Sequence, residues 1–431
     1  MRLVLGCNAL WANTGYGTQA RSLLPRLRDH GHAVANFAWY GLQGGMMVLD
    51  GITIYPVGHD VWGNDVAGPI CRHFNADLFL SLMDVWVCAE DLAARVRPSS
   101  WAAWAPVDHE PAPPQVIDRW KRSDYPVAYS LSGLQAAKNA GMENVSYIPH
   151  GLETGTFRPG DKREARNNLK LPQEAFICAM VAANKGYPAR KAFAENLQAF
   201  TQFHEKHPEA VLYLHTLRNT AHGGIDLQTL VDTLGISKSV YFVDQFANHL
   251  GLPGTYVADV YRAADVLMAA SQGEGFGLPI MEAQACGCPV ITTNWTAMRE
   301  LTVNGITTTP AQRVWTPLNS WAATVSVQHV ADALEAIYSR PTDEAKAAAE
   351  LGIITMRQNY DWDMCIERYW MPFLARVERE RAEAAAKAAE PVKPEPAAPI
   401  EPAAPVEPGP VAPAEAATEP EPERVAETGA V

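Results

Sequence analysis

The sequence predicts an α/β protein in which two doubly wound parallel sheets follow one another along the chain. Short apolar segments, typical of buried strands, alternate with longer segments whose apolar residues recur at helical spacing. The alternation runs in two series, one before and one after Pro159. The chain has 431 residues, of which 48% are hydrophobic and 19% charged, and it is therefore long and apolar enough for two such domains.

The first series of strands starts at the N-terminus. Its expected strands span residues 2–7, 33–40, 51–57, 77–83, 101–107, 126–131 and 145–149. Helices are expected from a Gly15-Tyr-Gly17 loop to about residue 30, over 114–122 and over 132–139. Ligands of doubly wound sheets bind at the carboxyl ends of the strands. Residues 104–111 and 148–153, which follow two of these strands, are therefore candidate site segments.

The second series of strands is expected at 175–182, 210–216, 240–243, 266–271 and 289–293. A helix expected over 190–203 carries a stripe of apolar residues near a 3.6-residue spacing, which indicates core packing rather than a ligand site. Further helical segments follow Pro341. Asp361 and Asp363, at the start of the last of them, are interpreted as an N-cap and a first-turn acid rather than as a metal-binding pair.

Four parts of the chain follow from this pattern. We expect a first α/β domain over 1–155, a second over 156–360, C-terminal helices over 361–390 that pack back across the domains, and a tail over 391–431. The tail is rich in Pro, Ala and Glu, holds 11 of the 32 prolines and has no aromatic residue. Such a segment cannot bury enough apolar surface to fold, so the tail is predicted to be disordered.

Composition excludes several classes of function. The formal net charge is −13, whereas non-specific binding of nucleic acid needs a basic face. The seven cysteines are scattered without a zinc or redox spacing, which indicates small buried residues in a reducing compartment. The N-terminus reads as a first strand, and no segment approaches the ~20 apolar residues of a membrane span. A cytoplasmic protein that binds no nucleic acid is the expectation.

The most informative stretch is Gly273-Glu274-Gly275-Phe276-Gly277-Leu278-Pro279-Ile280-Met281-Glu282. The glycines allow a sharp turn between a strand and a helix, and Pro279 suits the first helical position. The free amides of Phe276, Gly277 and Leu278 would then form an anion site, suited to a diphosphate. Glu282 and Glu274 would accept hydrogen bonds from sugar hydroxyls. The alternative reading is a tight turn with two solvated glutamates.

A second glycine pattern, Gly15-x-Gly17-x-x-Ala20, partly matches the dinucleotide-binding fingerprint. Its first glycine comes eight residues after the strand, and the next strand ends in Trp39-Tyr40 without the acid that would hold a ribose. We therefore interpret Gly15 and Gly17 as a loop that lets an acceptor or the phosphates of a donor approach the first helix.

Three stretches carry a resemblance to a known family. They are Glu274 to Glu282, which has two glutamates with seven residues between them, Ile148-Pro-His-Gly-Leu-Glu-Thr-Gly-Thr-Phe-Arg-Pro159, and Val181-Ala-Ala-Asn-Lys-Gly-Tyr-Pro-Ala-Arg-Lys191. With them the chain resembles a family 4-type glycosyltransferase of glycosyl transferases group 1. The resemblance implies the GT-B fold, in which two Rossmann-like domains face each other across a cleft. The first would bind the acceptor and the second a nucleotide-sugar.

The resemblance also implies a reaction and its residues. The reaction is metal-independent, retaining transfer from a UDP- or GDP-sugar that serves as co-substrate, with no further cofactor. Residues implied to bind the donor are Gly15, Gly17, Lys185, Arg190, Lys191, Glu274, Gly275, Phe276, Gly277, Leu278 and Glu282. Residues implied at the reacting centre are Asp108, His109, Arg190, Lys191 and Glu274. Either Asp108 or His109 is the aligned position beside the reacting carbon, and the contacts of Lys185, Arg190 and Lys191 with the diphosphate remain open.

The acceptor stays open between protein, glycan, small molecule and lipid, with membrane contact at most peripheral. Two other functions fit the sequence. A nucleotide-sugar epimerase of the same architecture would alter the donor without an acceptor, and a catalytically idle binding or scaffold protein would bind no nucleotide-sugar.

Overall fold

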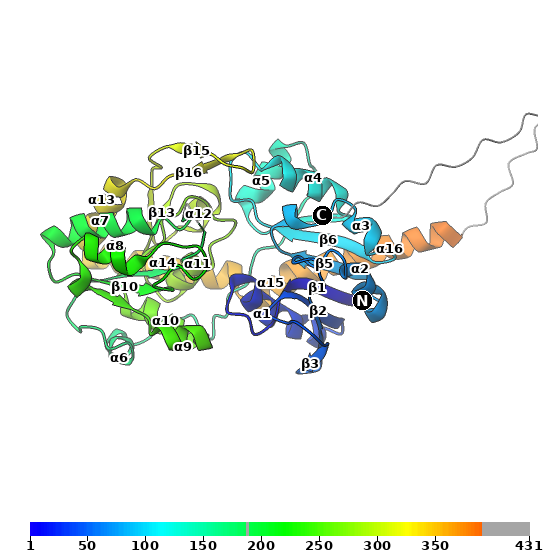
Figure 1. Ribbon diagram of the computed structural model, residues 1–431, viewed down its shortest axis with the longest axis horizontal. Helices are drawn as coiled ribbons and strands as arrows, with labels where there is room; N and C mark the ends of the chain where they lie inside the picture. Colours follow the sequence, from blue (N-terminus) through cyan, green and yellow to red (C-terminus); the bar gives the residue numbers. More distant parts are fainter. Residues whose placement is uncertain (187–188, 390–431) are drawn as a thin grey trace, which may run out of the picture. The chain divides into compact units, whose positions relative to one another are not determined.

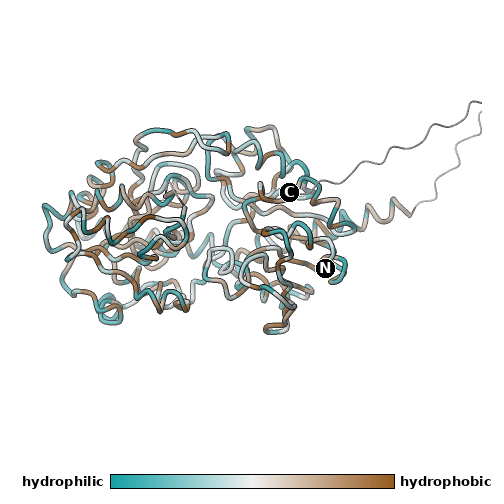
Figure 2. Tube along the Cα trace, viewed as in Figure 1, coloured by the Kyte–Doolittle hydropathy of each residue, from teal (hydrophilic) through white to brown (hydrophobic). Residues whose placement is uncertain are grey.

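The computed structural model describes residues 1–186 and 189–389, so the predicted tail lies outside the described residues. Residues 1–380 form one compact unit, which contains two parallel sheets covered by helices (Figure 1). The predicted fold class, two doubly wound α/β domains, is confirmed. Apolar residues concentrate in the strands of both sheets (Figure 2).

The first sheet has eight strands in the order β3-β4-β2-β1-β5-β6-β7-β8. Its strands are β1 (Arg2–Asn8), β2 (Ala33–Tyr40), β3 (Met47–Leu49), β4 (Ile52–Pro56), β5 (Leu78–Leu82), β6 (Ser100–Ala105), β7 (Tyr125–Ala128) and β8 (Ser146–Tyr147). All neighbours pair in parallel except β3 and β4, which form an antiparallel edge. The carboxyl ends of the parallel strands therefore meet at one edge of this sheet.

Helices cover both faces of the first sheet. On one face lie α2 (Ala67–Phe74), α3 (Leu92–Arg95), α4 (Pro114–Arg122) and α5 (Leu131–Asn139), whose apolar residues form one buried cluster with the strands. On the other face lies α1 (Gly15–Asp29), whose Leu23, Leu24 and Leu27 belong to a second cluster. A short helix, η1 (Val85–Val87), follows β5.

The second sheet has six strands in the order β11-β10-β9-β12-β13-β14. They are β9 (Ile177–Val181), β10 (Val211–His215), β11 (Val240–Phe242), β12 (Val266–Met268), β13 (Val290–Thr293) and β14 (Gly305–Thr308). One face packs against α7 (Phe193–Lys206), α8 (Leu227–Thr233) and α13 (Val327–Tyr338), and the other against α6 (Lys162–Asn168) and α10 (Gly254–Ala263) (Figure 1). Other elements of this half are η2 (Ser237–Ser239), α9 (Gln245–Leu250), α11 (Leu278–Ala285), α12 (Thr296–Leu301) and an antiparallel pair, β15 (Arg313–Trp315) and β16 (Trp321–Ala323).

The chain returns to the first sheet after α14 (Thr342–Tyr360). The next elements are α15 (Trp362–Cys365), η3 (Ile366–Trp370) and α16 (Met371–Ala389). Trp370 is fully buried, and its ring lies 4.9 Å from that of Trp104 on β6. Arg26 of α1 forms ion pairs at 2.9 Å with Asp363 at the start of this segment and with Glu153. Residues 361–374 thus complete the core on the α1 face of the first sheet.

Two helix starts differ from the sequence predictions. The helix expected from residue 190 begins at Phe193, because Ala192 before it has a left-handed backbone with φ 48°. Arg190 and Lys191 therefore precede the helix instead of forming its first turn. Gly15 and Gly17, predicted as a loop, form the first turn of α1, where the Thr14 side chain accepts a hydrogen bond from the Gly17 amide at 3.1 Å.

Two features are absent from the described part of the chain. Within residues 1–186 and 189–389 no helix is both long and apolar enough to cross a membrane. In the same residues no group of three or more His, Cys, Asp or Glu side chains is arranged to hold a metal ion. Asp361 caps α15 by accepting hydrogen bonds from the amides of Asp363 and Met364, as predicted for an N-cap.

Candidate active site

The glycine turn follows β12 and leads into α11, which begins at Leu278 with Pro279 as its second residue. Gly277 has φ 111°, a conformation that strongly favours glycine, and it is the N-cap without a side-chain hydrogen bond. Within the described residues, the amides of Gly275, Phe276, Gly277 and Leu278 donate no hydrogen bond to protein. These unpaired donors at the start of a helix would attract an anion.

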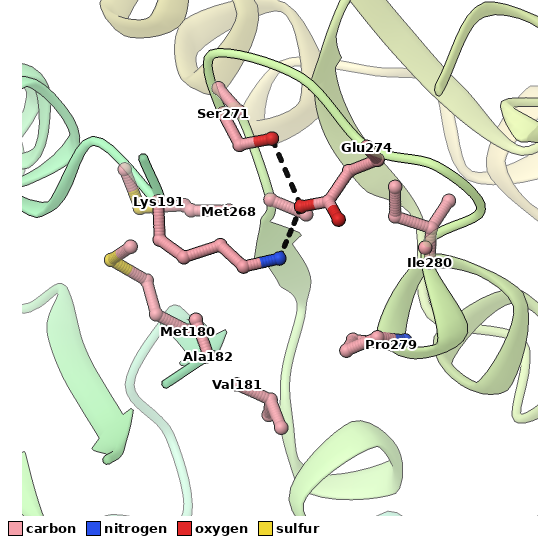
Figure 3. Close-up of a pocket in the computed structure, with 12 residues that line it drawn as sticks. Met180, Val181, Ala182, Lys191, Met268, Ser271, Glu274, Pro279 and Ile280 are labelled. Atoms are coloured by element: carbon pink, nitrogen blue, oxygen red, sulfur yellow. Dashed lines mark hydrogen bonds and ion pairs between the residues drawn. The ribbon is translucent and has the colours of Figure 1, made fainter. Parts of the chain in front are cut away.

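A small pocket opens beside this turn at the carboxyl ends of β9 and β12 (Figure 3). Its floor is apolar, and its polar wall consists of Lys191, Ser271 and Glu274. Gly277 and Pro279 at the N-terminus of α11 also line it. A few convergent polar groups in an apolar pocket are typical of small-molecule sites.

Glu274 is the centre of the polar wall, and its residue surface is only 9% exposed. One carboxylate oxygen accepts hydrogen bonds from the Lys191 ammonium and, at 3.0 Å, from the Ser271 hydroxyl (Figure 3). The other oxygen lies 3.3 Å from Nη1 of Arg190. Burial alone would raise the pKa of Glu274, but the charges of Lys191 and Arg190 outweigh it and lower the pKa below its usual value. Glu274 is therefore an ionised carboxylate between two cations.

The turn packs closely against the first domain. A Cβ atom added at Gly273 would lie 2.1 Å from the backbone oxygen of Asp108, and one added at Gly275 would lie 2.4 Å from Cβ of Pro106. Phe276 is 3% exposed, and its ring lies 5.1 Å from that of His150. The alternative reading of a turn with two solvated glutamates is wrong, because residues 273–277 are buried and both glutamates have protein partners.

Asp108 and His109 lie in the loop after β6, beside this turn. His109 is 7% exposed, and its Nδ1 lies 2.6 Å from Oδ1 of Asp108. Burial would raise the pKa of Asp108, but the hydrogen bond with His109 and the charge of Arg190 lower it instead. Asp108 therefore faces the same cluster as Arg190, and His109 contacts Asp108.

Sequence reasoning missed Asp84, Tyr16 and Tyr129, which lie in the same cluster. Burial raises the pKa of Asp84 to about 6, Asp108 adds to the effect, and Arg190 and Lys185 oppose it. Tyr16 belongs to the first turn of α1 and Tyr129 follows β7. The available signal was position, since Tyr129 directly follows the buried strand β7 and only Met83 separates Asp84 from the end of the buried strand β5.

The structure also shows the environments of three more residues that were predicted to bind the donor. Lys185 is exposed and pairs through its backbone with Gly223. Gly15 is exposed and faces the donor-side turn, since a Cβ there would lie 3.3 Å from the Leu278 side chain. Gly17 is buried, with a Cβ position 2.3 Å from the Ala12 carbonyl oxygen. Gly17 therefore allows the loop before α1 to fold and has no open side toward a ligand.

Glu282 lies on α11 and is partly buried. Its Oε2 accepts a hydrogen bond at 2.8 Å from the hydroxyl of Tyr261 on α10. Burial raises the pKa of Glu282 to about 7, which the Tyr261 hydrogen bond only partly opposes. The structure thus separates the two glutamates of the motif into an ionised one beside cations and one that titrates near neutral pH.

The raised pKa of Glu282 predicts a pH-dependent stability. Because the folded state holds the proton more tightly than the unfolded state, this group should destabilise the ligand-free protein increasingly as pH rises from about 4.5 to about 7. The Glu282→Gln variant lacks this effect, so its free energy of unfolding relative to the native protein should increase between pH 5 and pH 8. Urea unfolding at both pH values measures this difference in the free energy of unfolding. Glu350→Gln, at an exposed position of α14, is the control and should show no such change with pH. An equal difference at both pH values would contradict the assignment.

Part of the chain that includes Lys191, Glu274 and Glu282 matches a known protein family. Residues 177–338 match the family model described as glycosyl transferases group 1. A D-inositol 3-phosphate glycosyltransferase of Actinosynnema mirum is 34% identical over 164 residues, which is 38% of this chain and 38% of the relative. A D-inositol 3-phosphate glycosyltransferase 2 of Catenulispora acidiphila is 32% identical over 183 residues, 41% of each chain. The chain thus spans less than half the length of these curated relatives.

Solved structures extend the likeness of fold over 89% to 90% of the chain. Sucrose-phosphate synthase from Thermosynechococcus elongatus has a TM-score of 0.68 at 17% identity and covers 89% of this chain and 99% of its own. Anabaena Alr3699/HepE in complex with UDP and glucose has a TM-score of 0.62 at 16% identity and covers 90% and 100%. The predicted GT-B fold is confirmed by these structures, and the family match to glycosyl transferases group 1 covers residues 177–338.

Proposed function

We propose that this protein is a retaining glycosyltransferase that moves a sugar from a UDP- or GDP-sugar to an acceptor without a metal ion. One observation carries the proposal. The unpaired amides of residues 275–278 stand at a helix N-terminus beside a pocket whose wall includes Lys191. Helix N-termini and fixed cations stabilise the negative charge that develops on a departing diphosphate.

Each charged residue has a role in this proposal. Arg190 offers a planar fork and Lys191 a point charge to the phosphate oxygens. Both now neutralise Glu274, so an incoming diphosphate would share these cations and leave the Glu274 carboxylate to accept hydroxyls of the donor sugar. Glu282, once freed from Tyr261, would accept the ribose hydroxyls. The exposed Lys185 would approach the diphosphate from solvent.

The proposed stereochemistry rests on the surroundings of Asp108. A double displacement needs a free carboxylate as nucleophile, whereas Asp108 is already hydrogen-bonded to His109 at 2.6 Å. We therefore favour same-face attack of the acceptor assisted by the leaving phosphate, with His109 or Asp108 beside the reacting carbon. The close packing of Gly273 and Gly275 on the first domain would exclude water and limit hydrolysis of the donor.

A thermal-shift panel of UDP-, GDP- and ADP-sugars in EDTA tests the donor. A UDP- or GDP-sugar should raise the Tm, because a ligand at about 100 times its Kd adds roughly 2.7 kcal/mol to stability. The matching nucleoside, which lacks the diphosphate, is the control and should have little effect. Absence of stabilisation by any UDP- or GDP-sugar, or stabilisation only after a metal is added, would contradict the proposal. With the donor known, NMR of the product's anomeric proton should show retained configuration.

A further inference from the structure

The carboxyl edge of the first sheet lies next to the site, since Asp108 at this edge packs against Gly273. The strands β1, β2, β4, β5 and β6 are parallel, so the loops that follow them gather at this edge. These loops span residues 9–14, 41–46, 57–66, 83–91 and 106–113. We call them, together with Tyr40 at the end of β2, the acceptor edge.

The loops of the acceptor edge are acidic. Its loops contain no lysine and no arginine. Their acidic residues are Asp60, Asp65, Asp84, Glu90, Asp91, Asp108 and Glu110. The positive charges that lower the pKa of Asp84 most are those of Arg190 and Lys185. Both residues belong to the second domain and to the proposed diphosphate site.

Arginines that reach the acceptor edge from neighbouring helices are already engaged. Arg95 pairs with Asp91 at 2.7 Å, and Arg299 pairs with Glu110 at 3.1 Å. Arg119 donates a hydrogen bond at 2.7 Å to a backbone carbonyl and lies 3.4 Å from Glu90. A phosphate or sulfate group on an acceptor would therefore meet carboxylates without free cations, which is unfavourable.

The acceptor edge also exposes large aromatic side chains, one beside each of four strands. Trp11 is 37% exposed, Tyr40 53%, Trp62 37% and Trp86 41%. Two of them are held in place: Nε1 of Trp11 donates to the Gly41 carbonyl at 3.1 Å, and the Trp62 ring lies 5.0 Å from Trp39. Aromatic faces carry partial negative charge and pack on the apolar C–H face of a sugar ring. Such rigid side chains lose little conformational entropy on binding.

We propose that the acceptor is an uncharged oligosaccharide that stacks on the aromatic residues of the acceptor edge and donates hydroxyl hydrogen bonds to its carboxylates. This rests on the proposed function. An acceptor hydroxyl oxygen forms the new bond to the anomeric carbon, while the bond from that carbon to the diphosphate oxygen breaks. The hydroxyl proton leaves with the nucleoside diphosphate. The same edge rejects phosphorylated and sulfated acceptors by charge.

A glycan array tests the proposal with the full chain. Labelled protein is applied to uncharged oligosaccharides printed beside their phosphorylated and sulfated counterparts, and soluble D-inositol 3-phosphate is assayed as an acceptor in parallel. We expect binding to at least one uncharged oligosaccharide, at least tenfold weaker binding to its anionic counterparts, and no transfer to D-inositol 3-phosphate. Binding restricted to anionic glycans, binding to none of the glycans, or transfer to D-inositol 3-phosphate would overturn the proposal.

Variants connect the array result to the surface. Trp62→Ala and Trp86→Ala should each weaken glycan binding roughly tenfold, as for central aromatic contacts in other interfaces. Trp315→Ala removes a tryptophan that is 56% exposed on β15 and should leave glycan binding unchanged. Equal effects of all three substitutions would overturn the assignment of the surface.

Donor stabilisation, measured on the same preparations, separates the two proposals. Stabilisation by a nucleotide-sugar without oligosaccharide binding contradicts the acceptor class alone. Oligosaccharide binding without any donor stabilisation contradicts the transferase and leaves a glycan-binding surface.

Discussion

Replacing Lys191 by alanine is expected to lower kcat/KM for transfer about 100- to 1000-fold, the usual effect of removing one preorganised group that stabilises developing charge. Lys191 lines the pocket beside the unpaired amides of α11, and its ammonium now binds the carboxylate of Glu274. In the variant, a departing diphosphate would keep Arg190 and the helix N-terminus but lose the cation at the pocket wall.

Stability has to be separated from catalysis in this variant. Removal of Lys191 leaves Glu274 buried with Arg190 as its remaining cation, and breaking a buried ion pair costs roughly 3–5 kcal/mol. Lys191→Ala combined with Glu274→Gln removes the buried charge, so its urea midpoint should recover toward that of the native protein while kcat/KM stays low. Lys206→Ala, on the exposed end of α7, is the control. A stable Lys191→Ala protein with native kcat/KM would rule out the proposed role.

Gly273→Ala is expected to reduce kcat about 100-fold while changing donor affinity little. The added methyl group would lie 2.1 Å from the Asp108 backbone oxygen, a contact that only backbone movement can relieve. The substitution would push the glycine turn away from Asp108 and His109, and a displacement of 1 Å at a reacting centre costs about 100-fold in rate. The donor amides of residues 275–278 belong to the same domain as Gly273, so the donor site would move as a unit.

Kinetics and donor titration distinguish this outcome from general damage. Gly155→Ala is the matched control, because a Cβ atom there would meet nothing within 4 Å and its backbone has no positive φ. Equal loss of kcat and donor affinity in Gly273→Ala would instead indicate that the donor site itself has been distorted.

The fold was predictable because each sheet follows from short apolar segments separated by helices. Residues 114–122 were predicted as a helix and form α4 with the same limits, since Pro114 suits a helix start. Most expected strands ran past the observed ends, as at 266–271, where β12 ends at Met268 and the chain turns toward the glycines, whereas 33–40 has the observed limits. The helix start at residue 190 was missed because no local pattern predicts the left-handed backbone of Ala192.

The candidate site was only partly predictable. Glu274, Glu282 and the glycines lie within ten residues, so a local motif predicts that they act together. Their different charge states depend on Lys191 and on Tyr261, which come from other elements. Asp84 and Tyr129 carry no motif and join the cluster only because β5 and β7 end at the same edge. The interpretation as a solvated turn was wrong because the turn is buried by contacts with distant residues. Gly275 packs against Pro106, and the Phe276 ring packs against His150.

The chain passes between the two sheets twice, and the two passages are bonded side by side. The Leu152 amide donates to the Tyr360 carbonyl at 2.6 Å, and the Trp362 amide donates to the Leu152 carbonyl at 3.2 Å. A Cβ atom at Gly151 would lie 2.2 Å from the indole of Trp362, so the two passages also fit tightly together. Two backbone segments joined in this way can twist more easily than they can stretch. Swivelling of one half of the molecule against the other should therefore pivot near Leu152, with the largest travel at residues farthest from it.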